Sequence, residues 1–323
     1  MLTRRKAVVG LGALAALPLS HAASAQQGTV RLVVPAAPGG AIDAIGRLYA
    51  ERLKDILGQT WVIENRGGAN NTLGAAEVAR AAPDGATLLT NADIHLMAKH
   101  VMKQVPYDPV ADFTPISRFA TSPMVFVGHP GKTPADLRAL AAEMKATPDK
   151  HTFSNSGLGA MGHLASESFN SRVGVKTVIV SYRDTAPALT DVLGGQTTLM
   201  VAPLGSALQQ IQAGSLRAFA IMSERRSTQL PDVPSIAEAG FPGLNFLLWY
   251  ALWGPKGMAP DLVTQINGAV QTASKHPDLV QKLTALGAEP VTESATQFAS
   301  FFAAEATRSA ELARVAGIQP PAN

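Results

Sequence analysis

Cysteine is absent from this sequence of 323 residues. Disulfide bonds, thiolate metal sites, a cysteine nucleophile and the lipid-modified cysteine of a bacterial lipoprotein are therefore excluded. Aromatic residues make up only 6% of the chain and charged residues only 16%. Hydrophobic residues, at 46%, are numerous enough for a large core, so the low charge does not indicate disorder. At this length, two domains are the expected organisation.

An excess of positive charge is missing from most of the chain. The sequence has 27 Lys and Arg residues against 24 Asp and Glu residues, and Arg4, Arg5 and Lys6 account for the whole difference. The remainder is neutral and poor in aromatic residues. This composition gives no support for binding to nucleic acid or to an anionic membrane.

Long hydrophobic runs are also missing, apart from one short run near the start. Residues 7–17 are apolar and follow the basic residues 4–6, and Ala23-Ser24-Ala25 then offers a cleavage site. This order is typical of a secretory signal peptide, and the run is shorter than the roughly 20 residues that span a bilayer. We expect residues 1–25 to be removed after Ala25, by either Sec or twin-arginine export; the alternative is an uncleaved N-terminal anchor.

Strand and helix patterns alternate at the start of the mature chain. Apolar runs rich in β-branched residues predict strands at 30–34, 61–64 and 86–90, and apolar residues at helical spacing predict helices at 42–57 and 72–81. Strand, helix, strand, helix and strand in this order predict a parallel, doubly wound sheet.

A second alternating series predicts a second α/β lobe. Its strands are expected at 124–127, 152–154, 178–180, 198–201 and 217–222, with helices at 134–147, 163–173, 187–193 and 204–213. A long apolar strand at 245–253 follows, and then a helical tail at about 260–275, 277–286 and 294–316. The tail has too few strands for a sheet of its own, so we expect it to pack on the first lobe.

The chain is therefore expected to pass twice between two lobes, near 122–128 and 247–253, which is a hinge geometry. We expect lobe one to contain residues 26–125 and 250–323, and lobe two to contain residues 126–249. Ligands of such sheets bind beyond the carboxyl ends of the strands. The loops at those ends are rich in glycine and small polar residues and comprise 35–43, 65–71, 91–95, 154–162 and 181–186.

Several short motifs stand in a fixed order from about residue 30 to the C-terminus. They include Pro38-Gly39-Gly40 with Asp43 and Arg47, Glu64-Asn65-Arg66 with Gly68-Ala69, Ala82-Pro83-Asp84-Gly85, Pro106-Tyr107-Asp108-Pro109, Leu193-Gly194-Gly195-Gln196, Leu230-Pro231-Asp232-Val233-Pro234 and Leu286-Gly287-Ala288-Glu289-Pro290. Taken together, they resemble the Bug family, the substrate-binding proteins of tripartite tricarboxylate transporters. Asn70-Asn71 stands where many members have a glycine pair, and Arg183-Asp184 stands where many have Lys-Gly.

The resemblance implies an α/β, two-lobed periplasmic-binding-protein (Venus-flytrap) fold with doubly wound sheets and a helical C-terminal tail. It implies a periplasmic protein without catalysis that captures a small mono- or dicarboxylate between its lobes, partly through ordered waters. The partners would be this ligand and the membrane permease subunits of a tripartite tricarboxylate transporter. We expect a monomer without cofactor or metal.

Lobe one supplies the first candidate cradle for the ligand. Gly39-Gly40-Ala41 precedes a predicted helix, so it can offer free backbone N–H groups and the partial positive charge of a helix start to a carboxylate. The alternative is a plain strand-to-helix turn, and Asp43 is expected to cap the helix in either case. The other candidate ligand-binding residues of this lobe are Asn70, Asn71, Asn91 and Asp93.

Lobe two supplies two further candidate loops. The first contains Ser154-Asn155-Ser156, Gly159 and His163, and the second contains Tyr182, Arg183, Asp184 and Thr185. Residues 157–162 formally match the dinucleotide pattern G-x-G-x-x-G, but the preceding strand is short and polar, so we interpret them as a helix start that binds a carboxylate.

The roles of three side chains in these loops stay open at this point. His163 either faces the cleft or is a partly exposed residue at the helix start. Arg183 either pairs with a ligand carboxylate or points to solvent. Asp184 either caps the next helix or accepts a hydrogen bond from the ligand.

Cations are scarce in the strand-end loops, where Arg66 and Arg183 are the only Lys or Arg residues. A multiply charged anion would recruit more of them. Backbone amides, Ser, Asn and bridging water suit one or two carboxylates, so we expect a ligand of charge −1 or −2.

Two other functions are alternatives to the capture of a solute for transport. The same fold could serve as the ligand-sensing partner of a membrane signalling protein. A periplasmic hydrolase would need a triad such as Ser156, His163 and Asp184 or Asp191, but the sequence has neither a G-x-S-x-G elbow nor an H-E-x-x-H motif.

Overall fold

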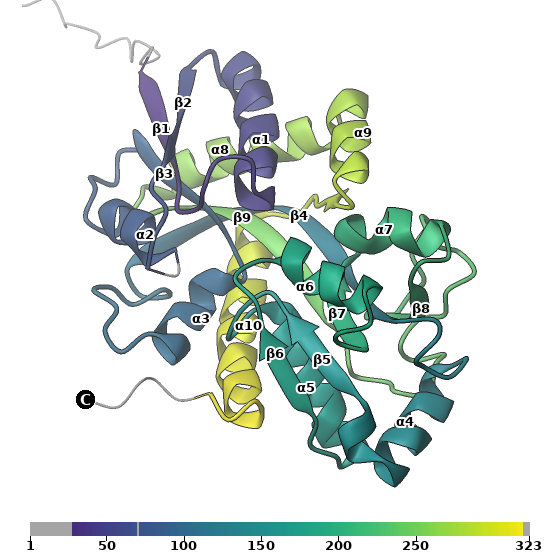
Figure 1. The fold of residues 1–323 in the computed structure, drawn as a ribbon. Helices are drawn as coiled ribbons and strands as arrows, with labels where there is room; N and C mark the ends of the chain where they lie inside the picture. Colours follow the sequence, from purple (N-terminus) through teal and green to yellow (C-terminus); the bar gives the residue numbers. More distant parts are fainter. Residues whose placement is uncertain (1–27, 70, 319–323) are drawn as a thin grey trace, which may run out of the picture.

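The computed structural model describes residues 28–69 and 71–318 (Figure 1). The expected signal peptide and Asn70 lie outside the described residues. Within the described ranges, no helix is both long enough and apolar enough to cross a membrane.

The first sheet contains three parallel strands in the order β2-β1-β3: β1 (Thr29–Val34), β2 (Thr60–Asn65) and β3 (Thr87–Ala92). The helices that follow them are α1 (Ala41–Leu57), α2 (Thr72–Ala79) and α3 (Ile94–Val101). β9 (Leu247–Pro255) runs antiparallel to β3, and the first half of β4 (Phe113–Gly128) runs antiparallel to β9. The predicted order of strands and helices up to β3 is confirmed. We call this sheet and its helices lobe one.

The second sheet is built around β5 (Thr152–Asn155), which lies parallel to β6 (Val178–Ser181) and to β7 (Leu199–Pro203). The second half of β4 runs antiparallel to β7 and to β8 (Arg217–Ile221). The helices of this part are α4 (Leu137–Ala146), the short η1 (Pro148–Lys150), α5 (Met161–Val173), α6 (Thr185–Leu193) and α7 (Leu204–Gln212). We call this part lobe two.

The two lobes are joined where β4 leaves one sheet and enters the other. Residues of β4 up to Pro123 pair with β9, whereas residues from Met124 pair with β7 and β8. On the return, the N–H of Phe246 donates to the carbonyl of Met222 in lobe two (2.7 Å), and the next residue, Leu247, pairs with Pro123 in lobe one. The crossings therefore lie side by side, and the second falls just before the expected range 247–253. The boundaries 26–125, 126–249 and 250–323 stay predictions.

The C-terminal helices are α8 (Pro260–Ser274), α9 (Pro277–Ala285) and α10 (Ala295–Val315), with the short strand β10 (Glu289–Pro290) between the last two. α10 starts at a capping box formed by Ser294 and Gln297. Near its start, Phe298 and Phe302 pack in the lobe-one core, while Ala313 near its end packs in the lobe-two core. α10, in yellow in Figure 1, thus reaches along α3 and α5 and connects both cores.

Two elements differ from the predicted pattern. α3 begins inside the predicted loop 91–95, and β4 extends through residues 113–123, where no strand is predicted. Pro115 and Pro123 interrupt the strand pattern of that segment, because proline cannot donate to a sheet ladder. On α3, Met97 and Val101 pack into the lobe-two core, so this short helix already forms part of the contact between the lobes.

Candidate functional site

The start of α1 forms the first candidate cradle at the carboxyl end of β1. Gly39 has a φ of 85°, a left-handed conformation that favours glycine, and Gly40 is the N-cap residue. No side chain caps this helix, and residues 39–41 are exposed. Among residues 28–69 and 71–318, the first-turn N–H groups of α1 therefore have no side-chain partner, and a bound carboxylate can use them.

Asp43 is buried beneath this loop and is hydrogen-bonded to groups of the protein. The residue is 3% exposed. Oδ2 accepts hydrogen bonds from the Gly39 N–H and from Arg47 Nε (2.9 Å each), and Oδ1 accepts one from Asn65 Nδ2 (2.9 Å). Asn65 Nδ2 also donates to the carbonyl of Ala36 (3.1 Å). The expectation that Asp43 caps α1 is wrong, because its carboxylate instead reaches back to the N–H before the cap.

These hydrogen bonds decide the charge of Asp43. Burial alone would raise the pKa of this carboxyl group, but the hydrogen bonds from Arg47, from the Gly39 N–H and from Asn65 outweigh burial and lower its pKa to about 2. A pKa depressed below the ordinary value of 3.8 means that Asp43 stabilises the folded protein at neutral pH. That contribution is lost as the pH falls through the interval between these two values.

Asp43→Asn is expected to lower the melting temperature at pH 7 and to have a much smaller effect near pH 2, where Asp43 itself becomes protonated. Thermal unfolding followed by circular dichroism at both pH values measures this. Asp55→Asn is the matched control, since Asp55 is an exposed residue of the same helix. Equal destabilisation by Asp43→Asn at the two pH values would contradict the ionised network.

The start of α2 brings two predicted asparagines together. Asn71 has a φ of 66° and precedes α2 as an N-cap residue without a side-chain cap. Its Nδ2 donates to Asn91 Oδ1 (3.3 Å), which also accepts from the Ala92 N–H (2.9 Å). Asn91 is 1% exposed, and its own Nδ2 has no hydrogen-bond partner among the described residues. The Nδ2 group of Asn91, at the carboxyl end of β3, is therefore a donor without an acceptor among the described residues.

Asp93 lies apart from these groups, at the junction of the lobes. It lines a small cavity of about 10 Å³ together with residues of α3, α5, β9 and α10, including Met161, Trp249 and Glu305. Burial and, to a smaller extent, the nearby Glu305 raise the pKa of Asp93 to about 7. The structure does not bring its side chain together with the start of α1.

In lobe two, Ser154 and Asn155 are fully buried and serve the loop architecture. The Ser154 hydroxyl donates to the carbonyl of Ala188, on α6 (3.2 Å). Asn155 Oδ1 accepts from the Gly157 N–H (2.8 Å), and its Nδ2 donates to Ser181 Oγ (3.2 Å). Asn155 thus ties the two candidate loops of lobe two to each other, whereas Ser156 remains partly exposed between them.

His163 is buried in the first turn of α5, with 6% exposure. Its Nδ1 accepts a hydrogen bond from the Gly159 N–H (3.3 Å), and burial lowers its pKa. The neutral ring therefore positions the glycine loop. Ala160, the N-cap residue of α5, provides no side-chain cap either, but the first helical residues, Met161 and Gly162, are buried, unlike the exposed start of α1.

The loop after β6 divides into anchored and free side chains. The Tyr182 hydroxyl donates to Asp191 Oδ2 (2.5 Å), and Asp184 Oδ1 accepts from the Thr185 N–H (2.6 Å), which fits the capping alternative for Asp184. Arg183 is exposed and makes no ion pair or hydrogen bond with any described residue. By contrast, Arg66 lies 3.6 Å from Glu64 and 3.4 Å from Glu77. Of the two loop cations, Arg183 is therefore the one without an ion-pair partner among the described residues.

The glycine loop of lobe two touches lobe one. A Cβ atom at Gly159 would lie 2.6 Å from Val101 Cγ1 and 3.6 Å from Met97 Cε, both on α3. The backbone of this loop can approach α3 so closely only because residue 159 has no side chain. The glycine loop of lobe two is thus in close contact with α3 of lobe one.

The side chains of His163, Asp184 and Asp191 hydrogen-bond with partners other than one another. Among residues 28–69 and 71–318, no hydrogen bond joins Ser156 to His163, or His163 to Asp184 or Asp191. No cluster of three or more potential metal ligands occurs in the same ranges.

Sequence reasoning did not single out Asn65, Arg47 and Ser181 as site residues. All three hold candidate loops in place through hydrogen bonds to Asp43 or Asn155. Asn65 and Arg47 belong to the motifs noted above, which is the signal that could have identified them.

The chain is similar to a known protein family in sequence and to solved structures in fold. Residues 45–318 match the family described as "Tripartite tricarboxylate transporter family receptor". Protein BugT of Bordetella pertussis is 35% identical over 290 residues, which cover 89% of each chain. The structure of R. palustris Rpa4515 with adipate is 32% identical, has a TM-score of 0.79 and covers 91% of this chain and 98% of its own. That of MatC (Rpa3494) from Rhodopseudomonas palustris with bound malate is 31% identical, with a TM-score of 0.75 and coverage of 88% and 98%.

Proposed function

This chain belongs to the tripartite tricarboxylate transporter receptor family, and we propose that it is a periplasmic solute-binding protein that captures a small mono- or dicarboxylate between its lobes. Membership confirms the Bug-family resemblance and the two-lobed α/β fold. The observation that carries the proposal is the open helix start at Gly40, whose N–H groups suit a carboxylate. Two relatives that share this fold were solved with adipate and with malate.

The ligand is held, in this proposal, by groups from both lobes. Lobe one offers Gly39, Gly40 and Ala41 with the amides of Asn71 and Asn91, and lobe two offers the glycine loop with Ser156 and the exposed Arg183. A helix-start contact contributes about 0.3–1 kcal/mol, up to about 2 when partly buried. Micromolar affinity needs about 8 kcal/mol, so several loops must act together.

The expected charge of the ligand depends on which arginines of the candidate loops are free to pair with it. Arg66 is paired with two glutamates, which leaves Arg183 as the loop cation without a partner in the described structure. One arginine and several N–H donors suit a ligand of charge −1 or −2. A hydroxylated or uncharged ligand body would reach the asparagine amides.

Arg183→Ala is expected to lower the affinity for a dicarboxylate about tenfold, because the guanidinium group pairs with the second carboxylate. The affinity for the monoamide of the same dicarboxylate should change little. Isothermal titration calorimetry with malate and a malate monoamide measures both losses. Arg80→Ala, an exposed arginine at the end of α2, is the control. Equal losses for the two ligands would show that Arg183 does not read the second carboxylate, and tight citrate binding would overturn the charge assignment.

Delivery to the permease completes the proposed function. Closure of the lobes would bury the ligand and present one closed surface to the membrane subunits of a tripartite tricarboxylate transporter. We propose that the protein acts as a monomer in the periplasm after cleavage behind Ala25. The runner-up is the same capture with a membrane signalling protein as the partner.

Binding without turnover separates capture from hydrolysis. The protein is expected to bind one carboxylate per chain and to leave ester and phosphoester substrates unchanged. Turnover that disappears in Ser156→Ala would favour a hydrolase and contradict the proposal.

A further inference from the structure

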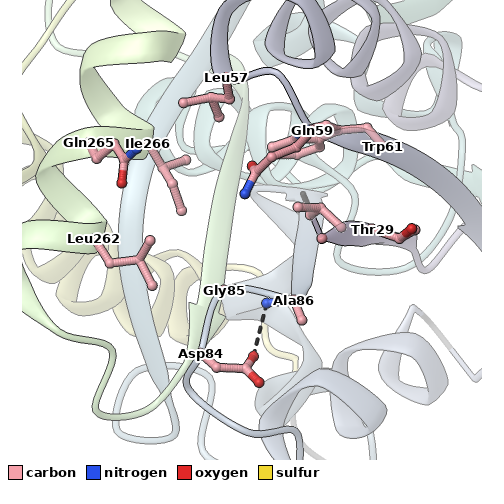
Figure 2. Close-up of a pocket in the computed structure, with 12 residues that line it drawn as sticks. Thr29, Leu57, Gln59, Trp61, Asp84, Gly85, Ala86, Leu262, Gln265 and Ile266 are labelled. Carbon is pink, nitrogen blue, oxygen red and sulfur yellow. Dashed lines mark hydrogen bonds between the residues drawn. The ribbon is translucent and has the colours of Figure 1, made fainter. Parts of the chain in front are cut away.

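Two cavities of the described structure differ in their relation to the lobe boundary. A pocket of about 100 Å³ lies at the amino ends of β1, β2 and β3, where Asp84 Oδ1 accepts a hydrogen bond from the Ala86 N–H (2.9 Å), as Figure 2 shows. All residues that line it belong to lobe one, so its shape does not depend on how the lobes are arranged. The smaller cavity of about 10 Å³ around Asp93 is lined by both lobes, so a movement of the lobes would open it.

The cavity around Asp93 lies where α3 of lobe one meets α5 of lobe two and the connecting helix α10. Asp93 and Met97 belong to the α3 side, Met161 and Leu164 to α5, and Leu312 to α10. Met97 also packs in the lobe-two core, so α3 makes a real contact across the boundary. Separation of α3 from α5 would therefore admit water to this cavity.

The carboxyl group of Asp93 receives no hydrogen bond from another described residue. The residue is 7% exposed and is the N-cap residue of α3, yet its side chain caps no N–H group of the helix. Two potential donors that line the same cavity do not serve it: Trp249 Nε1 has no partner among the described residues, and the Ser309 hydroxyl donates to the carbonyl of Ala306 (2.8 Å). A cavity of this size holds one water at most. Burial with so few donors disfavours a carboxylate and favours the neutral acid.

The charged and titratable groups on the neighbouring elements do not compensate a charge on Asp93. On α10, Glu305 lines the cavity and pairs with Arg308 (3.2 Å), which also donates to the carbonyl of Asn245 at the return crossing. The negative charge of Glu305 opposes ionisation of Asp93. On β9, burial and, to a smaller extent, Asp93 raise the pKa of Tyr250, so this phenol is neutral.

The nearby histidines titrate outside the range in which Asp93 does. Burial lowers the pKa of His95, on α3, to about 4, and it also lowers the pKa of His163, on α5. Burial instead raises the pKa of Asp93 to about 7; its own backbone N–H opposes this less strongly, and Glu305 adds to it. Glu167, further along α5, lies near Asn170 and Lys176 and does not line the cavity.

We propose that Asp93 is a proton-dependent switch at the lobe junction: its carboxyl group is neutral while α3 packs on α5 and α10, and loss of the proton favours separation of α3 from α5. The packed junction then holds one proton more than the separated junction, in which water hydrates the carboxylate. A falling pH therefore favours the packed arrangement, and a rising pH favours the separated one. The switch belongs to the lobes themselves and does not depend on which ligand is captured.

The distance between α3 and α5 in the ligand-free protein tests this directly. Because the chain has no cysteine, spin labels can be attached to Lys99→Cys on α3 and Ser171→Cys on α5, both exposed positions. Pulsed electron paramagnetic resonance then gives the populations of short and long distances at each pH. We expect the ratio of separated to packed molecules to rise up to about tenfold per pH unit between the ordinary pKa of 3.8 and about 7, and to level off above that range.

Asp93→Asn decides whether this carboxyl group causes the change. Asparagine has nearly the same size but cannot ionise, so the ratio should be independent of pH in this variant. Glu167→Gln, which removes a partly buried acid of α5 outside the cavity, is the matched control and should respond to pH like the unchanged protein. Distances that do not change with pH, or that change equally in Asp93→Asn, would overturn the proposal.

Thermal unfolding of the unlabelled protein gives a second, independent measurement. A carboxyl group whose pKa is raised in the folded state destabilises the fold progressively as the pH rises from 3.8 to about 7. The melting temperature of Asp93→Asn relative to the unchanged protein should therefore be higher at about pH 8.5 than at about pH 5.5. The same difference at both pH values would show that Asp93 holds no proton at the junction and would also overturn the proposal.

Discussion

Replacement of Gly40 by valine is expected to abolish ligand binding while leaving the melting temperature of the ligand-free protein almost unchanged. Gly40 has a φ of −74° and a ψ of 168°, which any residue can adopt, and an added Cβ atom would meet only the carbonyl oxygen of Ala37, at 3.6 Å. The branched side chain would, however, cover the open N–H groups at the start of α1. Calorimetry should show a loss of at least about a hundredfold, or about 2.7 kcal/mol.

Gly268→Val is the control for this experiment. Gly268 is an exposed residue of α8, and an added Cβ atom would have no heavy atom within 4 Å. The affinity of Gly268→Val for the ligand should equal that of the unchanged protein. Survival of binding within about threefold in Gly40→Val would show that the helix start is not the carboxylate cradle.

Gly159→Ala is expected to hold the lobes apart and to lower the affinity for the ligand about tenfold or more. The new Cβ atom would lie 2.6 Å from Val101 Cγ1 of the other lobe, at a residue with a φ of 77°. In the proposed hinge motion the overlap would disappear when the lobes separate, so the substitution would favour the open state over the closed state. Small-angle scattering with saturating ligand should give a larger radius of gyration than the unchanged protein.

Two further variants separate this overlap from backbone strain. Gly174→Ala places alanine at the same φ of 77°, at the end of α5, with no heavy atom within 4 Å of the new Cβ. It should therefore destabilise the fold without changing the radius. Val101→Ala combined with Gly159→Ala removes the overlapping methyl group and should restore part of the affinity. If Gly159→Ala left both radius and affinity unchanged, the contact with α3 would have no part in closure.

The fold could be predicted from local patterns because most of its elements are uninterrupted. β1, for example, appears as a short apolar run between clear breaks, and α10 begins at a serine followed three residues later by glutamine. The first half of β4 could not, since its two prolines and several polar residues resemble a loop. Its strand conformation depends on pairing with β9, which is more than a hundred residues away.

Side-chain direction limited what could be predicted of the site. Ser154 and Asn155 were correctly placed at the end of a strand, but periodicity could not show that both would be buried by α6 and the neighbouring loop. Asp43 illustrates the same limit: its position suggests a cap, whereas its hydrogen bonds to Arg47 and Asn65 depend on how β2 is placed beside α1. These roles become visible only when the loops are seen together.

The measurement that tests capture of a small carboxylate most directly is mass spectrometry of the ligand that co-purifies with the protein from its native host. Native spectra give the mass of the complex, and denaturation releases the small molecule for identification. We predict one molecule per chain with one or two carboxylate groups, absent from the Gly40→Val protein purified in parallel. A neutral molecule, an anion with three or more carboxylates, or an equal amount of ligand on Gly40→Val would contradict it.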